Sequence, residues 1–182
     1  MILQSELCTI KIELDDTYAV GSKDNRPYDI ELNPFNLTRS GSYAHSIAVD
    51  LFYKEYKIAL VSNSPVCSSD DIATLCGDIL TIMQNQVITQ IDITSGKMVR
   101  YVELDTASDN YSIYNFNDGF IIHGEYEITM LNSRLEKQWS FRGNDAFVAH
   151  GNKSSFEIKE DRICLYDFED TYYEIDFDGK VL

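Results

Sequence analysis

The sequence predicts an all-β fold, an antiparallel meander of about four propeller-like, four-stranded repeats. The first observation is a recurring hairpin, in which a short apolar strand meets an Asp or Asn turn and a second strand follows. Its turn residues are Asp50, Asp92, Asn132 and Asp176, at steps of 42, 40 and 44 residues. Near-constant steps of this size indicate one supersecondary unit whose copies stack on a shared core. The second observation is composition, because twelve Tyr and nine Phe favour strands.

The first 45 residues form the least regular part of the predicted fold. Residues 9–14 alternate between apolar and polar side chains, which predicts a strand with one buried face. Residues 28–32 predict a shorter strand. Residues 46–182 hold the repeats, and we predict a single β-repeat domain over 1–182. The recurring hairpins pair residues 46–50 with 56–60, 88–92 with 98–104, 128–132 with 137–141, and 172–176 with 180–182.

The segments between the hairpin turns resemble propeller blades in their strand content. Between Asp92 and Asn132 we expect four strands, at residues 98–104, 111–116, 120–123 and 126–131. Between Asn132 and Asp176 there are five extended segments, at residues 137–141, 146–149, 155–158, 163–166 and 172–175. One of them is therefore an additional strand or a loop. Residues 69–75 form either one or two helical turns or a loop. Four blades either close tightly, with residues 1–45 supplying a strand, or stay open, and a β-sandwich is the third alternative.

Two of the hairpin turns carry a family resemblance. Residues 88–97 read ITQIDITSGK and residues 176–180 read DFDGK. They resemble the strand–turn–strand element of quinoprotein-type β-propeller blades, and Gly96 and Gly179 would supply the positive φ that closes each hairpin. The resemblance implies a tryptophan that docks neighbouring blades, for which Trp139 is the candidate. It matches no cofactor-binding position, so we expect no cofactor. The chain is also similar to small bacterial all-β proteins.

The charge of the chain limits its partners. Fifteen Lys and Arg stand against thirty Asp and Glu, a formal net charge of −15. Such a surface repels nucleic-acid phosphates and anionic lipid, so we expect neither nucleic-acid nor membrane binding. It would speed association with a basic protein. The alternative is that the charge serves solubility alone.

The N-terminus and the cysteines favour a cytoplasmic protein. The first residues have neither a basic start nor an apolar run of signal-peptide length. Cys8, Cys67, Cys76 and Cys164 contain no C-x-x-C pair, and we interpret them as reduced thiols. If a leader had been lost, Cys67 and Cys76 would be the disulfide candidate. Exposed sheet edges would allow a homodimer.

An acidic and aromatic C-terminal stretch provides the candidate partner-binding residues. Nine acids and two bases lie between residues 157 and 178, interleaved with Tyr and Phe. Aromatic rings in an acidic field suit recognition of Arg and Lys. The candidates are Glu169, Asp170, Tyr172, Tyr173, Glu174, Asp176 and Asp178. The alternative is that the aromatics are core and the acids are solvated strand faces.

The sequence gives no argument for catalysis or for a metal site. His45, His123 and His150 have no zinc-hydrolase spacing. Glu174, Asp176 and Asp178 share the spacing of the first half of a calcium loop, but a period of two equally places them on one face of a hairpin. We therefore expect a non-enzymatic protein-binding module, such as an acidic immunity or antitoxin-like inhibitor of a basic partner. The alternative is a small-molecule or carbohydrate-binding domain with a Tyr-rich concave face.

Overall fold

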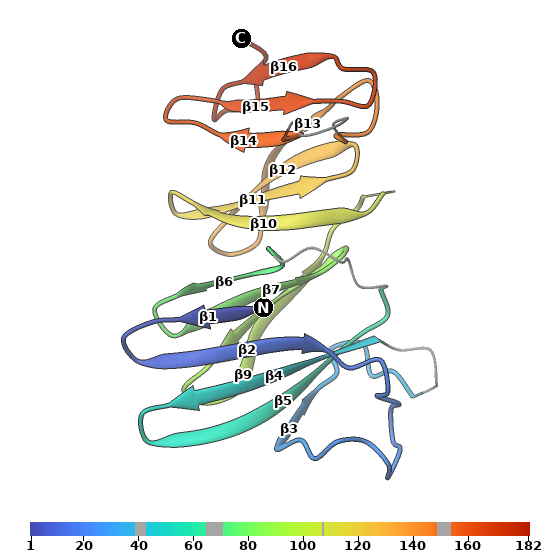
Figure 1. Ribbon diagram of the computed structural model, residues 1–182, viewed down its shortest axis with the longest axis vertical. Helices are drawn as coiled ribbons and strands as arrows, with labels where there is room; N and C mark the ends of the chain where they lie inside the picture. The colour runs from blue at the N-terminus through green and yellow to red at the C-terminus, as the bar shows by residue number, and fades with distance from the viewer. Residues whose placement is uncertain (39–42, 65–70, 107, 149–153) are drawn as a thin grey trace. The chain divides into compact units, whose positions relative to one another are not determined.

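A computed structural model describes residues 1–38, 43–64, 71–106, 108–148 and 154–182 (Figure 1). These ranges contain sixteen strands and no helix. The same residues accordingly provide no helix long and apolar enough to cross a membrane. The all-β prediction is confirmed.

The strands form four small sheets that follow one another along the chain (Figure 1). The first sheet has the order β1-β2-β4-β5-β3, and the other three follow chain order. All pairs are antiparallel except β3 with β5, which is parallel. The first sheet contains β1 (Ile2–Gln4), β2 (Cys8–Leu14), β3 (Ile30–Leu32), β4 (Tyr43–Leu51) and β5 (Lys54–Ser62). The second contains β6 (Ala73–Cys76), β7 (Ile79–Gln84), β8 (Val87–Asp92) and β9 (Lys97–Glu103). The third contains β10 (Asn110–Phe116), β11 (Gly119–Gly124), β12 (Glu127–Asn132) and β13 (Lys137–Arg142), and the fourth contains β14 (Phe156–Ile158), β15 (Ile163–Tyr166) and β16 (Tyr172–Ile175).

The four recurring hairpins occupy equivalent places in these sheets. The turns after Asp50, Asp92 and Asn132 join β4 to β5, β8 to β9 and β12 to β13. In each sheet, the two joined strands are the last two of four neighbouring antiparallel strands. The turn after Asp176 follows β16, and its return strand is reduced to one bridge between Ile175 and Val181. The repeat prediction is therefore confirmed. The N-terminal residues are part of it, because β1 and β2 complete the first sheet.

Two local alternatives are settled by the structure. Of the predicted segment 146–149, residues 146–148 are a loop and residue 149 lies outside the described residues; the other four segments between Asn132 and Asp176 contain strands. Residues 73–75 form neither helical turns nor a loop, because they belong to β6, which begins at Ala73 and pairs with β7. Ser69 and Asp70 lie outside the described residues.

The chain divides into two compact units, Met1–Leu104 and Asp105–Leu182. In the first unit, apolar side chains of the first two sheets share a core that includes Ile10, Ile47, Ile58, Leu80 and Ile82. In the second unit, the third and fourth sheets share a core that includes Ile121, Ile128, Phe147, Leu165 and Ile175. The single domain over 1–182 stays a prediction.

An aromatic side chain joins the two sheets within each unit. Trp139 on β13 donates its indole Nε1–H to the carbonyl oxygen of Phe177 at 2.9 Å, and its ring lies against Gly179. Trp139 thus lies where the propeller resemblance implied, between consecutive sheets.

The first unit has the same contact with a tyrosine. Tyr56 on β5 donates its hydroxyl to the carbonyl oxygen of Ile93, and its ring lies against Gly96. In both units the accepting carbonyl follows the Asp of the turn, and the glycine has positive φ, 70° at Gly96 and 78° at Gly179. The predicted glycine conformations are confirmed. We call the two contacts the aromatic clasps.

Candidate functional site

The fourth sheet presents the predicted partner-binding residues on two different faces. Successive side chains of a strand point to opposite sides. Along β16, Tyr173 and Ile175 face the core shared with the third sheet, whereas Tyr172 and Glu174 face outward. The register places Cys164 opposite Glu174 and Tyr166 opposite Tyr172, which extends the outer face over β15.

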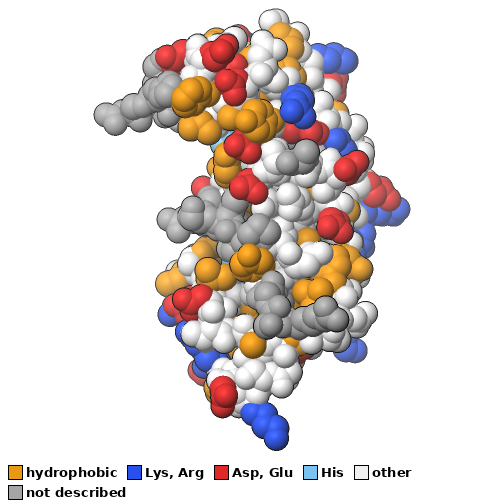
Figure 2. Space-filling view, turned by 90° about the vertical axis from the view of Figure 1, so that its right-hand side faces the viewer, with side chains coloured by type: hydrophobic (Ala, Val, Ile, Leu, Met, Phe, Trp, Pro, Cys, Tyr) orange, Lys and Arg blue, Asp and Glu red, His pale blue; other side chains and the backbone are white. Residues whose placement is uncertain are grey.

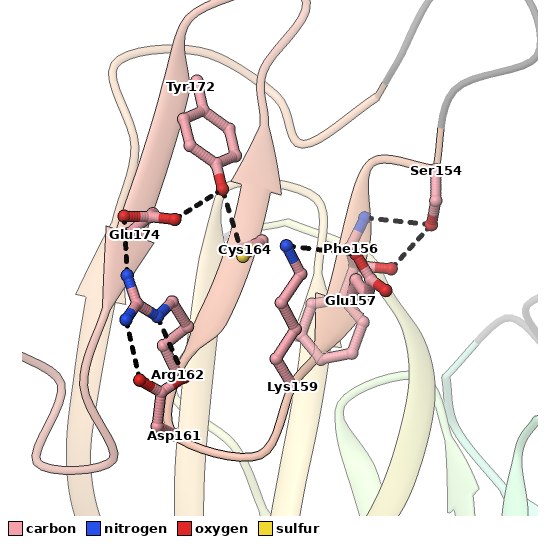
Figure 3. A network of polar contacts seen from close by, with 9 residues as sticks. All are labelled: Ser154, Phe156, Glu157, Lys159, Asp161, Arg162, Cys164, Tyr172 and Glu174. Atoms are coloured by element: carbon pink, nitrogen blue, oxygen red, sulfur yellow. Dashed lines mark hydrogen bonds and ion pairs between the residues drawn. The ribbon is translucent and has the colours of Figure 1, made fainter.

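The outer face carries a network of polar contacts (Figure 3). The Tyr172 hydroxyl lies 2.8 Å from Glu174 Oε1, to which it donates, and 3.2 Å from Cys164 Sγ. Arg162 bonds Glu174 Oε2 at 3.0 Å and Asp161 Oδ2 at 2.7 Å. The hydrogen bond from Tyr172, together with Arg162, lowers the pKa of the Glu174 carboxyl. The acids of this face therefore already have basic partners.

The turn between β15 and β16 is organised by a fully buried carboxylate. Asp167 Oδ1 accepts the backbone N–H of Thr171 at 2.8 Å and of Glu169 at 3.1 Å, and Oδ2 accepts the Tyr173 hydroxyl at 2.7 Å. Burial acts to raise the pKa of Asp167, but these hydrogen bonds outweigh it and the pKa is lowered. Asp167 is thus charged at neutral pH and holds the turn in one conformation.

This turn displays aromatic and acidic side chains together. Phe168 is 51% exposed and Tyr172 is 43% exposed, while Glu169 and Asp170 between them are also exposed. The rings of Tyr166 and Tyr172 lie 4.8 Å apart. Figure 2 shows acidic and hydrophobic side chains side by side over the fourth sheet, at the top of the view. We call residues 166–172 the acidic-aromatic turn.

Asp176 and Asp178 lie in a separate turn at the other end of β16. Asp176 Oδ1 accepts the backbone N–H of Asp178 at 2.9 Å and of Lys180 at 2.8 Å, and Lys180 Nζ lies 3.4 Å from Asp178 Oδ2. Because β16 has four residues, this turn is about 13 Å from the acidic-aromatic turn. These two acids do not share a surface with Glu169 and Asp170.

Tyr173 supports the site from inside rather than lining it. Its hydroxyl donates to Asp167 and accepts the backbone N–H of Asn144 at 3.1 Å. Its ring packs edge-on against Phe141 and Phe147, at centroid distances of 5.6 and 6.1 Å. Burial raises the pKa of the Tyr173 hydroxyl. Of the seven predicted residues, Glu169, Asp170 and Tyr172 lie in the acidic-aromatic turn, and Glu174 contacts Tyr172 on the outer face.

Three residues of the site lie in the predicted 157–178 stretch but were not among its seven candidates. Phe168 and Tyr166 add the aromatic surface, and Asp167 fixes the backbone. A sequence signal for this turn was available: residues 167–171 (DFEDT) begin with Asp-Phe and an acidic residue, as do residues 176–180 (DFDGK) of the recurring hairpin turn. Both turns place their fourth residue at positive φ, 61° at Asp170 and 78° at Gly179.

The described residues contain no group of three His, Cys, Asp or Glu placed to hold a metal ion. His45 and His123 are buried, and burial lowers the pKa of each to about 4. His150 lies outside the described residues. Neither His45 nor His123 belongs to the acidic-aromatic turn.

No family model and no curated protein matches this chain. Among solved structures, it is similar to BamB from Moraxella catarrhalis, a β-propeller, with 12% identity over 80% of this chain and 47% of that one and a TM-score of 0.50. Two further matches have TM-scores of 0.45: the computationally designed Ika4 protein (10% identity; 65% of this chain, 75% of that one) and Hsv2 of Kluyvelomyces marxianus (6% identity; 84% and 48%). The chain spans about half the length of BamB. The likeness to BamB supports the propeller-like fold.

Proposed function

We propose that this chain is a non-enzymatic protein-binding module that recognises a basic protein, as an immunity or antitoxin-like inhibitor would. The observation that carries the proposal is the acidic-aromatic turn. Buried Asp167 fixes the backbone that carries Phe168, Glu169 and Asp170, so the cost of ordering this backbone is not incurred on binding. Aromatic rings beside carboxylates suit Arg and Lys, through cation–π contact and charge pairing.

The overall charge supports the same class of partner. Residues 105–182 carry seven Lys and Arg against sixteen Asp and Glu, and residues 1–104 carry eight against fourteen. Both units are therefore negative, and their combined field would steer a positively charged protein toward the molecule. Binding of this kind weakens steeply with added salt.

The cellular setting is part of the proposal. We place the protein in the cytoplasm, a reducing compartment that suits the free thiols of Cys8, Cys76 and Cys164. Cys67, the other half of the disulfide candidate, lies outside the described residues. A toxin-like reading frame beside the gene would support an inhibitory role. Pairing of sheet edges into a homodimer stays a prediction, which sedimentation at several concentrations would test.

The test compares two double variants that remove equal charge from the second unit. Glu169→Gln with Asp170→Asn changes the acidic-aromatic turn, and Asp105→Asn with Asp118→Asn changes two exposed acids elsewhere. Immobilised wild-type protein is expected to retain basic proteins from a lysate of its source and to release them as salt rises from about 50 to 300 mM. The turn variant should retain less of these proteins than the control does. Equal retention by both variants, or retention indifferent to salt, would contradict the proposal.

Small-molecule or carbohydrate binding remains the second candidate, on account of a pocket of about 450 Å³ on the first sheet. This volume is within the usual range for ligand sites. Its lining includes one tyrosine, Tyr56, whose hydroxyl is already bonded to Ile93. A thermal-shift screen would test it, because a ligand at high occupancy raises Tm without any protein partner.

A further inference from the structure

The tip of the β4–β5 hairpin exposes two aromatic side chains. Leu51 pairs with Lys54, so Phe52 and Tyr53 form a two-residue loop. Phe52 is 101% exposed and Tyr53 is 71% exposed. Neither ring contributes to the core, so both would carry apolar surface into a contact with another molecule.

Turn geometry does not account for the two aromatics either. Three other two-residue loops in the described chain begin with a residue at positive φ: Gly77 at 56°, Asn85 at 58° and Asn117 at 47°. Such residues match the twist of a tight hairpin. Phe52 and Tyr53 have no positive φ and belong to no class of residue that favours turns. Neither folding nor burial requires aromatic side chains at this tip.

A pair of carboxylates lies directly behind the aromatics. Asp50 and Glu55 are opposite each other across the β4–β5 ladder, where like charges are destabilising. Within the described part of the chain, neither side chain makes an ion pair or hydrogen bond. The neighbouring Lys54 is directed elsewhere, with Nζ 2.9 Å from Thr94 O and 4.7 Å from the Tyr56 ring centre. A cation from outside would relieve the repulsion between Asp50 and Glu55.

The pocket of about 450 Å³ opens beside these carboxylates. Asp50, Glu55 and Asp29 line it together with Lys57, so its wall carries an excess of negative charge. Ala48 and Pro27 add small apolar surface. The volume accommodates a long side chain with its adjoining backbone. At the same end of the sheet, Cys8 pairs with Leu51, which places exposed Leu7 next to the hairpin tip.

We propose that the β4–β5 hairpin is a docking surface for a basic segment of a partner protein. An Arg or Lys side chain of that segment enters the pocket and contacts Asp50 and Glu55. Apolar side chains next to it pack on Phe52 and Tyr53. The charge of the pocket and the exposed rings select this occupant over an acidic or purely polar one. The proposal does not depend on the acidic-aromatic turn, which belongs to the other unit.

The test uses a defined probe, the peptide acetyl-Leu-Arg-Leu-Arg-Leu-amide, titrated into the ¹⁵N-labelled full chain at low salt. Saturable amide shifts are expected for residues 50–57. Asp50→Asn with Glu55→Gln should weaken binding at least tenfold, and Phe52→Ser with Tyr53→Ser should do the same. The matched control is Asp16→Asn with Asp24→Asn, two exposed acids of the same unit, which should change affinity less than twofold.

Several outcomes would overturn the proposal. Equal weakening by the control variant would mean diffuse charge attraction, and shifts confined to residues 166–172 would assign the peptide to the acidic-aromatic turn instead. A peptide with Gln in place of Arg that binds equally well would remove the role of the carboxylates. Sedimentation is the last check: a wild-type dimer that becomes monomeric in Phe52→Ser with Tyr53→Ser would identify a second copy of this chain as the occupant.

Discussion

Replacing Gly179 with alanine tests the aromatic clasp of the second unit. Gly179 has φ of 78°, in the left-handed region. A Cβ at this position would lie 2.7 Å from Cε3 and 2.8 Å from Cδ2 of Trp139. The substitution therefore combines an unfavourable backbone conformation with a collision against a rigid indole.

The two costs can be separated by variants of the same chain. The left-handed backbone costs roughly 1–2 kcal/mol for a residue with a Cβ. Overpacking against the ring costs about 1–3 kcal/mol more. We therefore expect Gly179→Ala to lower the free energy of unfolding by about 2–5 kcal/mol. Gly21→Ala is the control, because Gly21 has φ of 75° and no heavy atom within 4 Å of an added Cβ, so about 1–2 kcal/mol is expected.

The assay is urea unfolding followed by far-UV circular dichroism, with the fluorescence of Trp139, the single tryptophan, as a local reporter of the second unit. In a Trp139→Ala background the collision partner is gone, and Gly179→Ala should then cost only about 1–2 kcal/mol. An equal cost of Gly179→Ala with and without the indole, or a cost no greater than that of Gly21→Ala, would contradict a collision with Trp139.

Three further substitutions in the second unit have defined expected outcomes. His123 has its pKa lowered to about 4, so an unfolded chain binds a proton between pH 6.5 and 4 that the folded chain does not. His123 should contribute about 2 kcal/mol to the fall in stability from pH 7 to 4.5, so the fall should be smaller by this amount in His123→Gln, as urea unfolding at both pH values would measure. Asp167→Asn should cost about 1–3 kcal/mol and speed hydrogen exchange in the acidic-aromatic turn; unchanged exchange would show that Asp167 does not order it. Asp170→Gly should raise the unfolding midpoint, with a gain of about 0.5–1 kcal/mol, because relief of the left-handed backbone at φ of 61° exceeds the entropic cost of glycine; a lower midpoint would contradict this.

The repeat architecture could be predicted because its signal is local. Each hairpin is encoded within about ten residues by alternating strands and by turn residues such as Gly96 and Gly179. The pairing of β3 with β5 was not predictable in the same way, since Ile30 meets Ile58 through a parallel contact across 28 positions. Tyr56 was also missed as the counterpart of Trp139, because the two clasps share geometry and not residue type.

The sequence predicted which residue types make up the candidate site, but not which of these residues share one surface. Adjacent strand residues face opposite ways, so Tyr172 and Tyr173 could not both line one surface. Charge counting could not show which acids already have partners, because the Arg162–Glu174 ion pair depends on the pairing of β15 with β16. Burial of Asp167 follows from its bonds to a turn and a tyrosine, which only the folded chain brings together.

In both aromatic clasps, the group that accepts the hydrogen bond is a main-chain carbonyl, that of Ile93 or that of Phe177. Every amino acid supplies such an oxygen, so the receiving turn can change its side chains over generations and still be held. The donor too can vary, since an indole and a phenol perform the same task here. A contact of this kind requires little more than a small residue beneath the ring, so the same joint can form between sheets whose sequences differ.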